Sequence, residues 1–341
     1  MNGIKQFLPL FIVIVLLLPV SCSQLGKQPP EWENGAFTPD GKHYVYLYSI
    51  FNVTQYSQGG GATYRSGTTR YYLQIIDPYT GEKLLKNPIS FKDMVRIGDI
   101  SNDYVWLGTR DREKQKNSIA IVDIASGQLK YSHRDMIRQN PDVPFGYGTF
   151  YRQTSGLNEA VYEADDGRKY LVNPTNGIMT VLHGQSGPRI DLLGDEGYQF
   201  EYSMDGLQRL NENGSRIRFA IAGTDTTITS TDDFLNPQFL AVDKQSTADD
   251  AVPTVYHDSF FILSSKLQNN SNEMIFTRVN QHTLATVWAT TLQETITGES
   301  PVSGNKYRLR LNGQTLFAAN QSRLMAINLE TGAVTATYQL F

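Results

Sequence analysis

The sequence predicts an all-β fold, a single β-propeller made of four-stranded antiparallel blades. Short apolar strands follow one another with turn residues between them, and one strand–turn–strand motif recurs along the chain. No segment carries the apolar stripe of a long helix; the best candidate, residues 130–139, shows none over three turns. Apolar residues make up 40% of the 341 residues, which is ample for a hydrophobic core.

The recurring motif is a β-rich segment, an Asp or Asn, two or three turn residues, a glycine and a second β-rich segment. An Asp or Asn side chain can accept a hydrogen bond from its own backbone two residues on, and glycine supplies the positive φ that closes the turn. The clear copies lie at 77–81, 123–127, 173–177 and 328–332, and a fifth, at 280–284, has Leu284 in the glycine position.

The spacing of the motif indicates propeller blades. The interval from Gly81 to Gly127 is 46 residues, from Gly127 to Gly177 it is 50, and from Leu284 to Gly332 it is 48. A period of about 40–50 residues that holds four strands is typical of a propeller blade. The 107 residues between Gly177 and Leu284 hold two or three further blades, so we expect seven blades, with six or eight as alternatives. We expect both chain ends to share one blade, because an open sheet edge promotes aggregation.

The N-terminus predicts export. Lys5 precedes an apolar run over 7–20, which is short for a membrane span, and Cys22 follows as the single cysteine of the chain. The run 18–22, Leu-Pro-Val-Ser-Cys, resembles the lipobox of bacterial lipoproteins, with Pro19 where an aliphatic residue is usual. The alternative is an ordinary signal peptide that is cleaved beside Cys22.

These features divide the chain into a signal peptide over 1–22, a polar tether over 23–33 and the propeller over 34–341. The resemblance implies that Cys22 is lipidated and holds the protein on a membrane. Ser23 follows the cysteine where some bacteria read Asp as an inner-membrane signal, so the same resemblance implies the outer membrane. A chain with one cysteine has no intrachain disulfide, so its fold must be stabilised by the packing of its core.

The repeats resemble those of the quinoprotein-type family, the pyrroloquinoline-quinone-like (PQQ-like) propellers. That family's blade carries Asp, two variable residues, Thr-Gly, three residues and Trp after an apolar strand. The runs 77–81 and 328–332 match this turn, and 123–127 matches it with Ser in place of Thr. The Trp position is met by Trp288 and departs from the pattern elsewhere, at Leu85, Tyr131 and Ala336. The resemblance covers about half of the mature chain and implies the architecture, whereas these departures leave the cofactor unsupported.

The sequence carries little that supports catalysis. It lacks the D-x-D-x-D-G calcium motif, the G-x-S-x-G and H-E-x-x-H motifs and the P-loop. Its five His have no ligand-like spacing. We therefore expect no catalytic residues, no metal and no cofactor. A net charge of −4 gives no electrostatic reason to expect nucleic acid as a partner.

The candidate binding residues are aromatic and arginine side chains in two loops, because flat apolar faces combined with hydrogen-bond donors are typical of recognition surfaces. The alternative is that these aromatics pack between blades. Three consecutive glycines at 59–61 predict that the segment 56–67 is a mobile insertion rather than a strand. The candidates are Tyr64 and Arg65 in this segment, and Phe145, Tyr147, Phe150, Tyr151 and Arg152 in the second loop.

We expect a non-enzymatic binding or scaffold module of the bacterial cell envelope that binds an envelope protein or an extracellular ligand. The resemblance to quinoprotein-like lipoproteins of outer-membrane assembly supports this role. The alternative is a propeller-fold hydrolase that acts on glycans, which needs two carboxylates across a sugar site. Convergent carboxylates with a raised pKa would favour the hydrolase, and a flat aromatic rim would favour the scaffold.

Overall fold

The computed structural model describes residues 26–59, 62–110, 117–145, 149–152, 160–164, 166–182, 198–201, 218–220, 227–229, 235–242, 256–268, 271–280, 282–296 and 308–341. The predicted signal peptide and Cys22 lie outside these ranges. No helix within them is long and apolar enough to cross a membrane.

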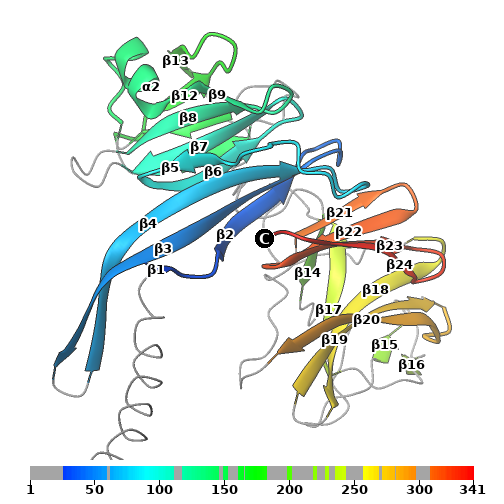
Figure 1. Ribbon diagram of the computed structural model, residues 1–341. Helices are drawn as coiled ribbons and strands as arrows, with labels where there is room; N and C mark the ends of the chain where they lie inside the picture. Colours follow the sequence, from blue (N-terminus) through cyan, green and yellow to red (C-terminus); the bar gives the residue numbers. More distant parts are fainter. Residues whose placement is uncertain are drawn as a thin grey trace, which may run out of the picture.

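The first half of the chain forms three antiparallel sheets of consecutive strands (Figure 1). The N-terminal sheet contains β1 (Gly26–Lys27), β2 (Glu31–Phe37), β3 (Tyr44–Gly59), β4 (Ala62–Ile76) and β5 (Ile89–Phe91). The second sheet contains β6 (Met94–Ile100), β7 (Tyr104–Arg110), β8 (Asn117–Asp123) and β9 (Gln128–Tyr131). After α2 (His133–Gln139), the third sheet contains β10 (Thr149–Arg152), β11 (Ala160–Glu163), β12 (Lys169–Val172) and β13 (Met179–Val181).

The second half continues in the same way. The fourth sheet contains β14 (Tyr198–Glu201), β17 (Leu235–Val242), β18 (Ser259–Gln268), β19 (Ser271–Asn280) and β20 (Thr286–Ile296). A separate pair is formed by β15 (Arg218–Ala220) and β16 (Thr227–Thr229). The C-terminal sheet contains β21 (Arg308–Asn312), β22 (Thr315–Ala319), β23 (Arg323–Asn328) and β24 (Val334–Gln339). The prediction of a β-rich fold built of antiparallel sheets is confirmed, whereas the blade number stays a prediction.

Helix α2 is a short element between the second and third sheets. Ser132 accepts a hydrogen bond from the backbone of Asp135, and the Asp135 carboxylate accepts one from the backbone of Ser132, which completes a capping box. The helix buries only Met136. A helix with one buried residue has no apolar stripe in its sequence. The pair Ser132 and Asp135 was therefore the sequence feature from which this helix could have been predicted.

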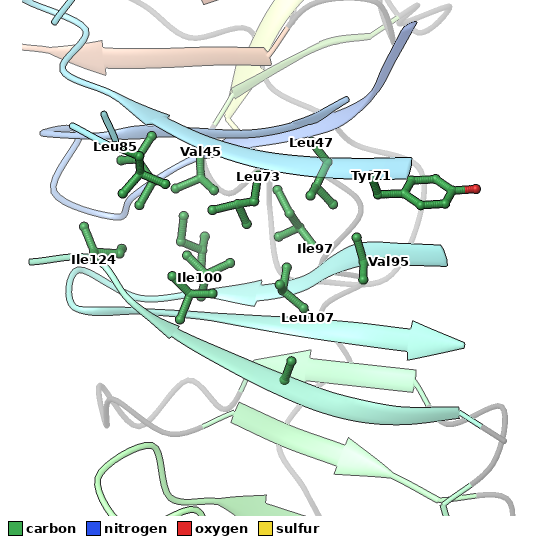
Figure 2. Close-up of a cluster of buried hydrophobic side chains, with 14 residues drawn as sticks. Val45, Leu47, Tyr71, Leu73, Leu85, Val95, Ile97, Ile100, Leu107 and Ile124 are labelled. Atoms are coloured by element: carbon green, nitrogen blue, oxygen red, sulfur yellow. The ribbon is translucent and has the colours of Figure 1, made fainter. Parts of the chain in front are cut away.

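Neighbouring sheets pack face to face, and alternate residues of a strand enter different cores. Val45 and Leu47 of β3 pack on the second sheet (Figure 2), whereas Tyr44 and Tyr46 pack on the C-terminal sheet. Likewise, Leu316 of β22 packs on the fourth sheet and its neighbour Phe317 on the N-terminal sheet. Because side chains alternate along a strand, each of these strands is buried on both faces. Full burial of one such aliphatic side chain stabilises the fold by about 1.5–3 kcal/mol.

The two ends of the described chain meet between sheets rather than within one. The N-terminal sheet contains only strands β1–β5, and the C-terminal sheet contains only β21–β24. The Tyr46 hydroxyl donates to the Leu340 carbonyl at 2.5 Å, and the Lys83 Nζ donates to the same carbonyl at 3.1 Å. The expectation of one shared blade is therefore wrong. The C-terminal sheet completes its four strands unaided, and side chains join it to the N-terminal sheet.

Strands β3 and β4 continue past β2 and β5 as an extension of residues 50–59 and 62–70, which we call the arm (Figure 1). Strand β1 pairs with β3 at Asn52 and Val53, and beyond these residues the arm is two-stranded. Strand β2 pairs with β3 only as far as Ser49, and β5 pairs with β4 only over 71–73. The β3–β4 pairing nevertheless continues to Gly59 and Ala62. The expectation that 56–67 is an insertion rather than a strand is therefore wrong for the described residues. The ladder extends through this segment as far as the pair Gly59 and Ala62.

Part of the predicted tether also lies in strands. In β1, Gly26 pairs with Val53 and Lys27 pairs with Asn52, and the Gln28 amide donates to the Phe51 carbonyl at 2.8 Å. Strand β2 begins at Glu31. The polar composition of 23–33 concealed these strands because an edge strand needs only backbone hydrogen bonds and can carry polar side chains.

Candidate functional site

The recurring turn has one geometry in the five copies that the structure describes. The side-chain Oδ1 of Asp77, Asp123, Asn173, Asn280 or Asn328 accepts a hydrogen bond from a backbone N–H two or three residues on, at 2.7–2.9 Å. The residue in the glycine position has a φ of 74° at Gly81, 63° at Gly127, 70° at Gly177, 55° at Leu284 and 71° at Gly332. The predicted turn, including its fifth copy with leucine, is confirmed.

Each of three turn glycines also lies against a side chain of a neighbouring sheet. A methyl group on Gly127 would overlap Leu85, one on Gly177 would lie 3.2 Å from the Tyr131 ring, and one on Gly332 would lie 2.5 Å from the Trp288 ring. Leu85, Tyr131 and Trp288 each follow the preceding turn position by four residues. The side chain four residues after the turn therefore makes a contact between successive sheets.

The same contact joins the last sheet to the first. At the C-terminal sheet the position four residues after Gly332 is Ala336, and Tyr338 makes the contact instead. A methyl group on Gly81 would overlap the Tyr338 ring. The Tyr338 hydroxyl donates to the Tyr79 carbonyl at 2.6 Å. The turn series therefore links the C-terminal sheet to the N-terminal sheet as it links neighbours elsewhere.

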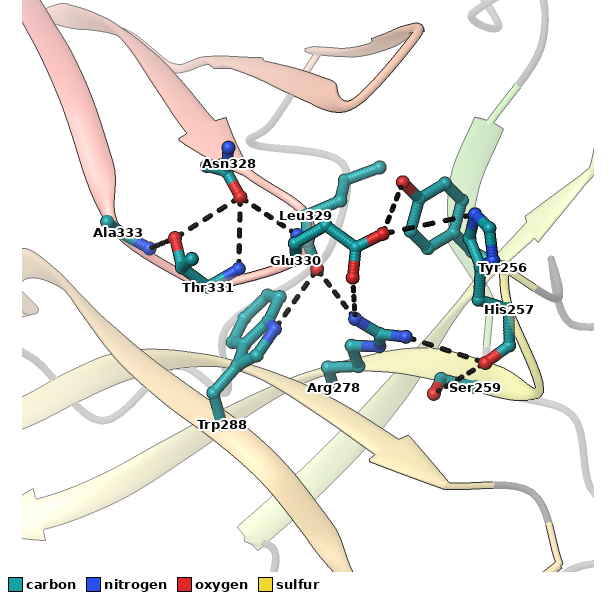
Figure 3. Close-up of polar contacts among 10 residues, drawn as sticks. All are labelled: Tyr256, His257, Ser259, Arg278, Trp288, Asn328, Leu329, Glu330, Thr331 and Ala333. Carbon is teal, nitrogen blue, oxygen red and sulfur yellow. Dashed lines mark hydrogen bonds and ion pairs between the residues drawn. The ribbon is translucent and has the colours of Figure 1, made fainter.

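Between the fourth and C-terminal sheets, this link carries a polar group that we call the Arg278 cluster, formed by Tyr256, His257, Arg278, Trp288 and Glu330 (Figure 3). The Arg278 side chain is only 8% exposed, and its Nη1 donates to the Glu330 carboxylate at 3.0 Å. The same Nη1 donates to the Leu329 carbonyl at 3.2 Å, and Nη2 donates to the His257 carbonyl at 3.4 Å. One buried cation therefore joins β19, the turn before β18 and the turn after β23.

Aromatic side chains complete the cluster. The Trp288 indole donates to the Leu329 carbonyl at 3.1 Å, and the Tyr256 hydroxyl donates to Glu330 at 3.1 Å. The Arg278 guanidinium lies 5.5 Å from the centre of the Tyr256 ring, within the range of a cation–π contact. The Arg278 Nε, in contrast, is buried and has no hydrogen-bond partner among the described residues.

The exposed side of the cluster is a two-residue turn with an unusual backbone. Tyr256 and Ser259 exchange backbone hydrogen bonds of 2.7 and 3.0 Å. Between them, His257 has a φ of 45° and Asp258 has a φ of 58°. Consecutive positive φ values are typical of a type I′ turn, in which Asn and Gly are favoured. A His-Asp pair is strained there by about 1–3 kcal/mol per residue, and such strain clusters at functional sites.

Two histidines and two carboxylates gather at this turn. The His257 Nε2 lies 3.9 Å from the Glu330 carboxylate, and the His282 Nε2 lies 3.7 Å from the Asp258 carboxylate. Both histidines and Asp258 are exposed. Sequence reasoning treated these residues as ordinary strand or loop positions. The one local signal in the sequence was the pair His257-Asp258 between two strand-like segments, at a turn that requires two positive φ values.

The pKa values of Glu330 and Asp135 are lowered from the ordinary values of these carboxyl groups. The hydrogen bond from Arg278 lowers the pKa of Glu330, and the hydrogen bond from Tyr256 adds to this effect. Burial raises the pKa of Tyr256, and its hydrogen bond to Glu330 raises it further. Hydrogen bonds from Ser132 lower the pKa of Asp135. A general acid in glycan hydrolysis needs a raised pKa, so the shift at Glu330 has the opposite sign.

This shift predicts a pH dependence of stability. A carboxyl group whose pKa is lower in the folded state stabilises the fold above its unfolded pKa, and it loses this effect as the pH falls through the folded pKa. The unfolded pKa of Glu is about 4.3. We expect the stability difference between the unsubstituted protein and Glu330→Gln to be full at pH 6 and to shrink below about pH 4. Urea unfolding of both proteins at pH 6 and pH 3 tests this, and a difference that does not change between the two pH values would contradict it.

No protein-family model and no curated protein matches this sequence. Distant structural matches include AztD from Citrobacter koseri, with 9% identity, 90% of this chain and 86% of that chain covered, and a TM-score of 0.26. The β-propeller domain of the Trilobed protease from Pyrococcus furiosus matches with 8% identity, coverage of 92% and 95%, and a TM-score of 0.32. The WD40 domain of SCAP from fission yeast matches with 8% identity, coverage of 89% and 85%, and a TM-score of 0.23. At these TM-scores the structural similarity is distant, and no function is inferred from it.

The structure places five of the predicted binding residues in strands of two different sheets. Phe145 is half-buried, and its ring centre lies 6.0 Å from that of Tyr162, so it packs against the core between the second and third sheets. Phe150, Tyr151 and Arg152 lie in β10, opposite Tyr162, Val161 and Ala160, and Tyr64 and Arg65 lie in the arm, opposite Ser57 and Tyr56. Except at Phe145, the side chains of these predicted residues, and Tyr147 as a whole, lie outside the described part. Phe145 packs between two sheets, as the alternative to a binding role predicts.

Among the described residues, no group of three or more His, Asp or Glu side chains is arranged to hold a metal ion. Cys22, the predicted lipidation site, is outside the described ranges.

Proposed function

We propose that this protein is a seven-bladed propeller of PQQ-like repeats that is exported, lipidated at Cys22 and held on the outer membrane. It serves there as a non-enzymatic scaffold that binds an envelope protein or an extracellular ligand. The observation that carries this proposal is the series of turn contacts between successive sheets, which ends with Tyr338 on Gly81. These contacts make the sheets a rigid frame from which loops of different sheets can be presented to one partner.

The packing of the sheets supports the propeller. Buried clusters join the fourth sheet to the C-terminal sheet, the C-terminal to the N-terminal sheet, the N-terminal to the second, and the second to the third. Strand β2 and the first strands of the other sheets also contact one another, in the pairs β2 with β6, β6 with β10, β14 with β21, and β21 with β2. A set of inner strands in this order is what radially arranged blades produce.

The Arg278 cluster favours the scaffold over the glycan hydrolase. Glu330 is held ionised by a buried cation that also binds two backbone carbonyls. These groups connect two sheets, and the carboxylate is in the wrong protonation state for a general acid. We therefore place the hydrolase second.

The test is an affinity pull-down of the full, Cys22-containing chain from its own solubilised envelope, read by mass spectrometry. The informative variant is Tyr147→Ala, Tyr151→Ala and Arg152→Ala together, because these residues combine aromatic faces with a cation in one segment. Thr180→Ala, at an exposed position of β13 in the same third sheet, is the matched control. We expect one envelope protein at a stoichiometric level, lost by about tenfold or more in the triple variant and retained in the control.

A partner that is retained equally by the triple variant would place the binding surface elsewhere. If no envelope protein is captured, and the purified chain releases sugars from envelope glycans, the hydrolase replaces the scaffold as the first proposal.

A further inference from the structure

A row of aromatic side chains crosses the N-terminal sheet next to the arm. On one face of this sheet, directly opposed residues follow one another from β2 to β5: Trp32, Tyr48, Tyr72 and Ser90. The rings of Tyr48 and Tyr72 are stacked, with their centres 5.2 Å apart and their planes 16° from parallel. This step is close to the ~4.8 Å between neighbouring strands, so the stack runs across the sheet from strand to strand.

The stack is covered at one end and ends without a ring at the other. Trp32 and Tyr48 pack against the core that the N-terminal sheet shares with the C-terminal sheet. Tyr72 lies one strand further out and is half-buried, and Tyr48 is its only ring contact among the described residues. The next position of the row is Ser90, whose side chain is small and exposed. No described ring therefore occupies the position above Ser90, beside the outer face of Tyr72.

A cation lies next to this position. Arg70 precedes Tyr72 by two residues in β4, so both side chains lie on the same face, about 6.6 Å apart along the strand at 3.3 Å per residue. Arg70 is exposed and forms no ion pair with a described carboxylate. No Asp or Glu occurs between Asp40 and Asp77, although acidic residues outnumber basic ones in the whole chain. The position therefore combines an aromatic face, a hydroxyl group and an unpaired guanidinium.

We propose that this position binds a pyranose sugar that carries a carboxylate, such as a uronic acid. A C–H face of the sugar packs on the outer face of Tyr72, because the negative face of an aromatic ring attracts polarised C–H groups. Arg70 binds the carboxylate, since its planar guanidinium can donate two parallel hydrogen bonds to the two oxygens. The Ser90 hydroxyl can bond a hydroxyl of the sugar. The inference rests on the extracellular ligand of the proposed function and names its chemical class.

The test is a titration of the purified full chain with methyl β-glucuronide, measured by isothermal titration calorimetry. Methyl β-glucoside has a hydroxymethyl group in place of the carboxylate and is the matched neutral sugar. Acetate supplies the carboxylate without the ring. We expect the glucuronide to bind about tenfold more tightly than either of the other two, because only the glucuronide contacts both Tyr72 and Arg70.

Two variants locate the site. Arg70→Gln is expected to weaken binding of the glucuronide by about tenfold and to leave binding of the glucoside unchanged, which removes the difference between the two sugars. Ser90→Trp is expected to abolish binding of both sugars, because the introduced indole would occupy the position beside Tyr72. The matched controls are Arg134→Gln in α2 and Thr180→Trp in β13, both at exposed positions outside the N-terminal sheet. Both controls are expected to bind the glucuronide as the unsubstituted protein does.

The inference is overturned if the glucuronide does not bind, if acetate binds equally well, or if Ser90→Trp binds the glucuronide unchanged. These results are distinguishable from a failure of the proposed function, because the envelope pull-down uses residues of the third sheet. A chain that captures an envelope protein and binds no glucuronide retains the scaffold and rejects the sugar site. A chain that binds the glucuronide as expected and captures no envelope protein supports the sugar site and limits the proposed function to its extracellular ligand.

Discussion

Gly81→Ala is expected to lower the free energy of unfolding by about 3 kcal/mol or more, through two separate effects. Gly81 has a φ of 74°, a conformation that costs an L-residue about 1–2 kcal/mol. The added methyl group would also overlap the Tyr338 ring. The ring cannot simply rotate away, because its hydroxyl donates to the Tyr79 carbonyl. The substitution therefore weakens the contact between the first sheet and the last, and urea unfolding measures the loss.

The matched control is Gly313→Ala. Gly313 has a φ of 57°, yet nothing lies within 4 Å of the position that its methyl group would take. We expect a loss of about 1 kcal/mol there, from the backbone alone. Equal losses at Gly81 and Gly313 would contradict the steric contact between the first and last sheets.

A double-mutant cycle with Tyr338→Ala isolates the contact further. Once the ring is absent, Gly81→Ala should retain only its backbone cost, so the coupling energy between the two sites is expected to be about 2 kcal/mol. Additive losses would show that the two residues do not contact each other.

Arg278→Met is expected to destabilise the protein by about 2 kcal/mol. Methionine keeps much of the aliphatic volume and removes the guanidinium. The His257 carbonyl and the Glu330 carboxylate then lose their buried donor, whereas the Leu329 carbonyl keeps its bond from Trp288. Breaking a fully buried pair costs about 3–5 kcal/mol. The smaller value applies here because Glu330 is 41% exposed and can return to water.

Arg138→Gln is the control for Arg278. The Arg138 side chain is 77% exposed and pairs with Asp135 in α2, so removing its charge is expected to change stability by no more than about 0.5 kcal/mol. Thermal or urea unfolding of the two variants measures the difference. A loss at Arg278 as small as that at Arg138 would show that the Arg278 cluster does not hold the fourth and C-terminal sheets together.

The sequence predicted the turns well and the candidate site poorly. Asn280 and Leu284 show the reason for the first result: the five-residue turn closes through its own side chain and backbone, so leucine can occupy a position that favours glycine. Arg278 shows the reason for the second. Its partner Glu330 lies 52 residues away in the chain and its partner His257 lies 21 residues away. No local pattern records those pairs.

The arm illustrates how a correct local rule led to a wrong conclusion. Three glycines at 59–61 do weaken a strand interior, and the segment was expected to interrupt the sheet for that reason. The structure extends β3 to Gly59 and begins β4 at Ala62, so the first of the three glycines lies in a strand. A glycine-rich composition is compatible both with a loop and with the end of a β-hairpin. Whether the flanking segments pair with each other decides between the two structures.

Strand periodicity, the repeating turn and the β-rich class follow from the sequence because each depends on residues within a few positions of one another. The order in which sheets share their faces, the contact between the two chain ends and the Arg278 cluster depend on packing across long distances. The bond from Tyr46 to Leu340 joins residues 294 positions apart. Such contacts form only when all the intervening sheets have stacked, so their geometry is a property of the folded chain.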